Sequence, residues 1–135
     1  MPERSDVERL RRLTQFIPEF RKYSETEEDF GRVVVDGSFH AEYPNVLDSF
    51  LRQLRQDEWL QGGYSGEEGQ RYRENPARLE EADLETLQRL LVYCSRGERF
   101  STGFWKEAVE GGFLLGILRR LRDIQYRLED RAETE

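Results

Sequence analysis

Residues 83–121 read DLETLQRLLVYCSRGERFSTGFWKEAVEGGFLLGILRRL, and this stretch decides the fold. Asp83 can cap a helix by accepting hydrogen bonds from its first free backbone amides. The leucines that follow recur at spacings of three and four residues, which place them on one helix face. Gly97 is expected to end this helix. A second helix would run from Phe104 to the glycine pair 111–112, where glycine tolerates the left-handed conformation of a helix end. A third helix would complete the stretch.

The third helix carries an apolar stripe with alternating spacings of three and four residues. Its members are Leu114, Ile117, Leu121, Ile124 and Leu128. Two heptads of this pattern suit either a core helix or a seam between two copies of the chain. Residues 129–135 follow as an acidic tail that we expect to fray.

Upstream of residue 83 the same helical periodicity recurs twice and predicts helices over residues 6–16 and 44–56. Ser65 and Glu68 have the spacing of a capping box, which predicts a short polar helix over residues 65–74. The β-branched run at 32–35 is followed by Asp36-Gly37, which suits the two-residue type I′ turn of a β-hairpin. Because a lone hairpin is marginal in water, we expect it to pack on the helices.

Together these elements predict a mainly α (α+β) fold. It would be a compact bundle of about five to six helices with one small β-hairpin near residues 32–41. A chain of 135 residues can bury one core without a metal or disulfide, and no linker interrupts it. We therefore expect residues 1–128 to form a single globular helical domain.

Charge and composition exclude several classes of function. The net charge of −7 and the pI near 4.9 oppose binding to a phosphate backbone, so no nucleic-acid partner is expected. The single cysteine, Cys94, cannot form an internal disulfide, and with the single histidine, His40, it cannot complete a usual zinc ligand set. No cofactor or metal is predicted. Because residues 1–6 lack the apolar run of a signal peptide and no stretch has the roughly 20 apolar residues of a membrane span, we expect a cytoplasmic protein.

The segments DLETL at 83–87, RGERFSTG at 96–103 and ILRRL at 117–121 resemble a family of small bacterial and archaeal proteins of unknown function. The family pattern is similar to D-L-E-T-L, an apolar helix, R-x-E-R-F-x-x-G and a terminal I-L-x-R-L. The position after Phe100 is often cysteine in that family and is Ser101 here, so a thiol-dependent activity at this position is not expected. The resemblance implies one compact domain and assigns no catalytic residue.

The junction between these helices holds the candidate ligand site. Arg96, Glu98 and Arg99 could hold a small anion, because two guanidiniums near a helix start offer bidentate donors to phosphate or carboxylate. Trp105 and Tyr72 could line a cleft beside them, although such aromatics more often belong to a core or its rim. In the alternative interpretation, the two arginines tie helix ends together by pairing with acids. The acids considered are Asp83, Glu85, Glu107 and Glu110.

Two further residues are expected to be structural. Cys94 shares a helix face with Leu87 and Leu91, which predicts a buried, inert thiol. His40 falls on the predicted hairpin and is expected to be an ordinary strand residue rather than a base or a ligand.

The sequence therefore favours a helical protein-interaction or regulatory module over an enzyme. Its partner would be another protein, or a second copy of the chain bound through the last helix. The alternative is a binder of, or an enzyme acting on, a small anionic ligand at the Arg96, Glu98 and Arg99 junction.

Overall fold

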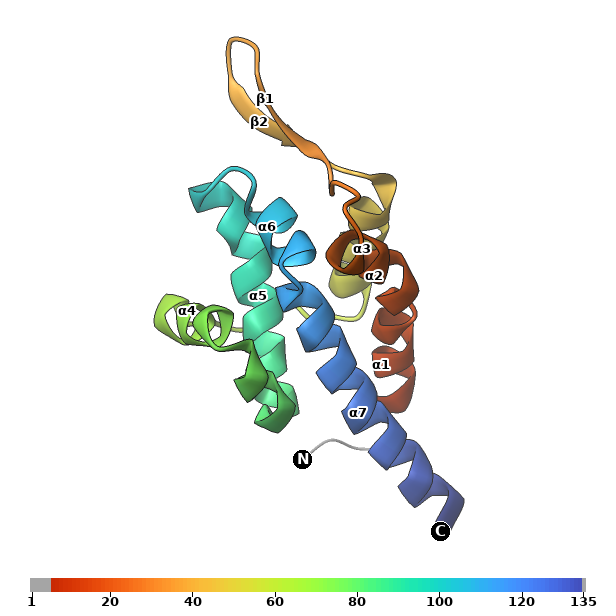
Figure 1. The fold of residues 1–135 in the computed structure, drawn as a ribbon. Coiled ribbons are helices and arrows are strands. Elements are labelled where there is room, and N and C mark those ends of the chain that lie inside the picture. Colours follow the sequence, from red (N-terminus) through yellow and green to blue (C-terminus); the bar gives the residue numbers. More distant parts are fainter. Residues whose placement is uncertain (1–5, 135) are drawn as a thin grey trace.

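The computed structural model describes the backbone of residues 6–134 and the side chains of residues 6–131. Within these limits the chain forms seven α-helices, one 3-10 helix (η1) and one two-stranded antiparallel hairpin (Figure 1). The elements are α1 (Asp6–Thr14), α2 (Ile17–Glu25), β1 (Arg32–Val35), β2 (Phe39–Glu42), α3 (Asn45–Gln56), α4 (Gly66–Glu74), η1 (Pro76–Glu81), α5 (Leu84–Phe100), α6 (Phe104–Glu110) and α7 (Phe113–Thr134). The mainly helical prediction with one hairpin is confirmed, with seven α-helices in place of five to six.

Helix α7 is the centre of the packing. It contacts α1, α2, α5, α6 and η1, and Figure 1 shows it running beside α1 along most of that helix. The apolar stripe predicted for this helix is 0–8% exposed and belongs to the core of a single chain. These five side chains are therefore covered within one chain.

The end of α7 extends beyond the predicted boundary near Leu128. The helix continues to Thr134, so the segment expected to fray is helical as far as the structure describes it. Glu129 accepts a hydrogen bond from Nε of Arg11 in α1, at 2.9 Å. The first and last helices are thus tied by an ion pair as well as by apolar packing.

The helix predicted over residues 6–16 is followed directly by a second helix that the sequence analysis missed. Helix α1 ends at Thr14, and α2 begins at Ile17 with Pro18 in its first turn. A proline there breaks no helical hydrogen bond, so it marks a helix start rather than only a stop. The change of direction brings the buried ring of Phe20 edge-on to Phe50 of α3, with ring centroids 5.1 Å apart.

Helix α5 runs through Gly97 instead of ending there. A β-carbon on Gly97 would lie 2.6 Å from the ring of Phe104, so glycine at this position allows α6 to approach α5 closely. The chain turns at Gly103, whose φ of 91° lies in the left-handed region that favours glycine. The helix end expected at Gly97 therefore lies at Phe100, and Gly97 serves a close contact between two helices.

The hairpin is formed by the predicted residues but projects from the helical body (Figure 1). None of residues 32–42 is buried, each strand makes few contacts with any helix, and Val33 approaches Gly103. The loop has three residues, and only Gly37 in it has a positive φ, so it is not the type I′ turn expected from Asp36-Gly37. The predicted packing of the hairpin on the helices is wrong.

Candidate functional site

Glu98, the carboxylate of the predicted ligand site, faces the start of α6. Its Oε2 accepts the backbone N–H of Gly103 at 2.9 Å, and its Oε1 accepts the backbone N–H of Trp105 at 3.1 Å. The first amides of a helix have no partner within the helix, so this carboxylate does the work of a capping side chain. Glu98 holds the α5–α6 turn together and does not orient Arg96 or Arg99.

Tyr43 completes the environment of Glu98. Its hydroxyl donates to Oε1 of Glu98 at 2.7 Å. Burial, and secondarily the hydrogen bond to the carboxylate, raise the pKa of Tyr43 well above its ordinary value, which keeps the phenol protonated and donating. Because Tyr43 lies between β2 and α3, this bond fixes the base of the hairpin to α5.

Arg96 and Arg99 are both exposed on the last turns of α5. Neither has an ion-pair or hydrogen-bond partner within the part of the chain that the structure describes. Three of the four acids considered as partners bind other groups: Asp83 the amide of Thr86, Glu107 the guanidinium of Arg73, and Glu110 the ammonium of Lys106. The predicted ionic tie between helix ends is therefore not formed by these two arginines.

The remaining predicted residues separate into two regions. Glu98 and Trp105 line a space of about 470 Å³ beneath the hairpin, which we call the hairpin groove. Apolar side chains of the groove are Phe39 and Ala41 from β2, Leu47 and Leu51 from α3, and Trp105 from α6. Trp105 is 3% exposed and packs edge-on against Phe50, so it is also a core residue.

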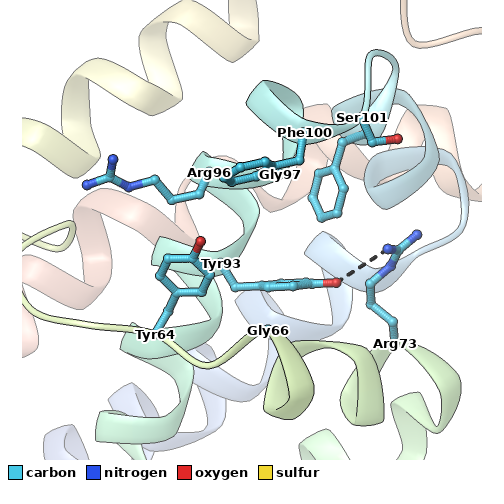
Figure 2. A pocket seen from close by; sticks show the side chains of 9 residues that line it. Tyr64, Gly66, Arg73, Tyr93, Arg96, Gly97, Phe100 and Ser101 are labelled. Carbon is cyan, nitrogen blue, oxygen red and sulfur yellow. Dashed lines mark hydrogen bonds between the residues drawn. The ribbon is translucent and has the colours of Figure 1, made fainter.

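Arg96 lines a different space, a cavity of about 230 Å³ between the start of α4 and the end of α5 (Figure 2). We call it the aromatic cavity, because its walls carry the rings of Tyr64, Tyr93, Phe100 and Phe104. Arg73 is the second arginine of its lining. Arg99 and Tyr72 line neither the groove nor the cavity, and Tyr72 is partly buried against the core. The five residues predicted as one site are therefore not brought together.

Three rings of the aromatic cavity, those of Tyr93, Phe100 and Phe104, were not expected from the sequence to line a site. Tyr93 lies at 5.6 Å from Phe104 with an interplanar angle of 82°, and at 6.4 Å from Tyr64. In the sequence, only Phe100 could have indicated this surface, because it falls on the side of α5 opposite the leucine stripe. In the structure its ring is 80% exposed. A single exposed ring is common on protein surfaces, so it is the grouping of Phe100 with the other three rings in the structure that marks this surface.

The predicted burial of Cys94 and the predicted position of His40 on a strand are confirmed. Cys94 is fully buried in α5 as a free thiol, and burial raises its pKa to about 12. His40 is a residue of β2, with Nδ1 3.2 Å from the hydroxyl of Ser38.

Across residues 6–131 no three His, Cys, Asp or Glu side chains are grouped so as to hold a metal ion. In the same range no helix has the combined length and apolar character that a bilayer crossing requires.

Comparison with known proteins identifies one family. The sequence model of a protein family of unknown function (DUF6508) matches residues 5–127, which is nearly the whole chain. This match agrees with the resemblance inferred from the segments between residues 83 and 121. No curated protein and no solved structure matches the chain.

Proposed function

Because the chain belongs to the DUF6508 family, to which no function is assigned, we propose from geometry alone that it is a protein-interaction module that docks through its hairpin. The partner we propose is a second copy of the chain, with the hairpin of each copy seated in the hairpin groove of the other. A regulatory role would then act through this association.

The observation that carries this proposal is the apolar face of the hairpin. Residues directly opposite each other in an antiparallel pair lie on the same face. The pairs Val33 with Ala41 and Val35 with Phe39 place four apolar side chains together, and Val33, Val35 and Phe39 are 39%, 72% and 63% exposed. A contiguous exposed apolar face of this kind on a soluble fold favours a protein contact.

The opposite face of the hairpin is polar. It carries the pairs Arg32 with Glu42 and Val34 with His40, and Arg32 binds Glu42 at 3.3 Å. The charges are thus kept off the apolar face, so a partner could cover that face without burying an unpaired charge. A two-stranded hairpin that stands alone is marginal in water, and a partner that covers it would supply the missing stabilisation.

The hairpin groove supplies a complementary receptor beside the arm. Leu47 and Leu51 of α3 and Trp105 of α6 form apolar parts of its wall, and the space of about 470 Å³ exceeds the volume of the two side chains at the tip of the arm, Val35 and Phe39. An exchange of identical arms makes two equivalent contacts and closes the assembly at two chains.

The charge of the chain does not oppose this arrangement strongly. Each copy carries a net charge of −7, but exposed charges farther apart than about 8 Å are largely screened at physiological salt. The hairpin projects from the helical body (Figure 1). A second copy bound through the arms therefore brings together apolar surfaces rather than like charges.

The test is the mass of the protein in solution, measured by light scattering during size exclusion over a wide range of concentration. We expect the wild type to reach twice the chain mass of 16.1 kDa, and Phe39→Lys to remain at the mass of one chain. Val34→Lys is the matched control, because it also replaces an apolar hairpin side chain with lysine, but on the opposite face and outside the groove lining, and should leave the dimer intact. A wild type that stays at one chain mass, or equal loss of the dimer in both variants, would reject the proposal.

A second candidate function keeps one specific observation in its favour. Arg96 is an unpaired guanidinium, within the described part of the chain, at the mouth of a cavity. This supports a small anionic ligand, bound or transformed there, although Glu98 and Arg99 would not share in the contact.

A further inference from the structure

We infer that the aromatic cavity is a binding site for a single-ring aromatic carboxylate. The ring would lie between Phe100 and Tyr93, and the carboxylate would pair with Arg96 at the mouth. This inference does not depend on the proposed docking through the hairpin, because the hairpin contributes no residue to the cavity.

The walls of the cavity are held in place by two close glycine contacts. A β-carbon on Gly69 of α4 would lie 2.4 Å from the ring of Tyr93, and one on Gly97 of α5 would lie 2.6 Å from the ring of Phe104. Each ring is therefore seated against a helix backbone where no larger residue would fit. Tyr93 and Phe104 then contact each other edge to face, which fixes two walls at right angles.

Phe100 provides the opposite wall. Figure 2 shows the rings of Phe100 and Tyr93 on two sides of the cavity, both close to edge-on, with Arg96 at one end and Arg73 at the other. The ring of Phe100 is 80% exposed, so one of its faces has no cover within the chain. A planar ring inserted between the two would gain stacking on both sides and would remove apolar surface from water.

The charges around the cavity select an anion. Arg73 is already engaged, since it stacks on the ring of Phe104 at 4.9 Å and lies 3.4 Å from both the Tyr93 hydroxyl and a carboxylate oxygen of Glu107. Arg96 is the guanidinium of the lining that has no partner within residues 6–131. No acidic residue lines the cavity. A carboxylate that reaches Arg96 would therefore meet a free bidentate donor and no repelling charge.

The volume limits the ligand to one ring. A cavity of about 150 Å³ holds a benzene molecule, so the space of about 230 Å³ fits a six-membered ring with a short acidic substituent. Most pockets for drug-sized ligands have about 300 Å³ or more, which argues against a nucleotide. The same chemistry could come from a free acid or from the C-terminal phenylalanine of a peptide.

The direct test is a titration followed by heteronuclear NMR, with phenylacetate as the probe. A fragment of about ten non-hydrogen atoms is expected to bind with a dissociation constant of roughly 1 mM. We expect saturable shifts of the backbone amide signals of Arg96, Gly97 and Ser101. Phenylacetamide lacks the charge and cyclohexylacetate lacks the flat ring, and each should bind about tenfold more weakly or worse. The tripeptide Ala-Ala-Phe with a free C-terminus, compared with its amide, shows whether a peptide end can supply the same group.

Matched variants separate this site from a general attraction of anions to the protein. Arg96→Gln should weaken phenylacetate binding about tenfold or more, whereas Arg99→Gln, an equally exposed and unpaired arginine three residues away, should change it less than about twofold. Phe100→Ala should also weaken binding, and Phe39→Ala, which removes the exposed ring of the hairpin, should not.

Three outcomes would overturn the inference. These are shifts that never saturate, equal losses in Arg96→Gln and Arg99→Gln, and equal affinity for phenylacetate and phenylacetamide. The docking proposal would survive each of them, because it is read from the mass of the protein and from Phe39 rather than from the cavity.

Discussion

The ring of Phe104 lies against the backbone of α5 at Gly97, so close that a β-carbon there would be 2.6 Å from the ring. This contact sets the distance between α5 and α6 and positions one wall of the aromatic cavity. It also explains why the helix contains a glycine three residues before its end without stopping at it.

Gly97→Ala is therefore expected to destabilise the protein. In an open helix the change would gain about 0.8–1 kcal/mol from helix propensity, but forcing a methyl group into a packed contact costs about 1–3 kcal/mol. We expect a net loss of about 1–2 kcal/mol in the free energy of unfolding, measured by urea denaturation. Gly66→Ala is the control, because a β-carbon at Gly66 in α4 would meet nothing within 4 Å. A Gly97→Ala protein as stable as the wild type would contradict the contact.

Glu98→Ala is expected to loosen the α5–α6 turn. The change removes the acceptor of two backbone amides and of the Tyr43 hydroxyl, and it leaves these donors partly buried without a partner. Loss of a cap together with unsatisfied donors should cost about 2–4 kcal/mol of unfolding free energy. Glu80→Ala, at an exposed acid of η1, should change stability by less than about 0.5 kcal/mol. Equal effects in the two variants would exclude a capping role for Glu98.

The ion pair between Glu68 and Arg89 should make stability depend on pH. The carboxylate of Glu68 accepts hydrogen bonds from Nε and Nη2 of Arg89, at 2.8 and 3.1 Å. These hydrogen bonds hold the pKa of Glu68 below its ordinary value of 4.5. A carboxylate with a lowered folded pKa stabilises the fold above pH 4.5, and the stabilisation is lost as the pH falls below that value. Because Arg89 is 40% exposed, we expect the ion pair to contribute only about 0.5–1 kcal/mol to the free energy of unfolding.

Glu68→Gln should thus be less stable than the wild type at neutral pH and should converge with it in acid. The comparison is made by urea denaturation at a series of pH values. Glu67→Gln, one residue away and without a partner within the described chain, should run parallel to the wild type. Curves for Glu68→Gln and wild type that stay parallel would show that the pair contributes nothing.

The thiol of Cys94 should resist labelling in the folded protein. It is fully buried and its pKa is raised to about 12, so a disulfide reagent at pH 8 should react only when the chain opens. We expect labelling at least about a thousandfold slower than in denaturant. Ser101→Cys places a second thiol in the exposed α5–α6 turn and should add one fast phase. Fast labelling of the wild type would mean that α5 is more open than the structure shows.

The parts of the fold that could be predicted are those in which a single segment carries the whole signal. The leucine stripes of α5 and α7 and the β-branched run of β1 each show their own periodicity, and all three elements form where the sequence places them. The family resemblance rested on short segments of the same kind.

The parts that failed depend on contacts between one helix and the next, which the periodicity of a single segment does not show. The residues around Gly97 give no indication that the ring of Phe104 packs where a β-carbon at this position would lie. Likewise, the clustering of Arg96, Glu98 and Arg99 ignored their directions around the helix, which send Glu98 to the α6 amides and leave both arginines in solvent. Sequence proximity on a helix is a poor guide to a shared site, because residues two positions apart point to different sides.

The packing of α7 against α1 has a consequence for synthesis of the protein. The core residues Leu10 and Leu13 of α1 are covered by a helix that begins about a hundred residues later, and Arg11 meets its partner at Glu129. In a nascent chain on the ribosome α3 can cover part of α1, but the side of α1 that packs on α7 stays uncovered until α7 has left the exit tunnel. Chaperones that shield apolar segments during translation would encounter this protein at α1.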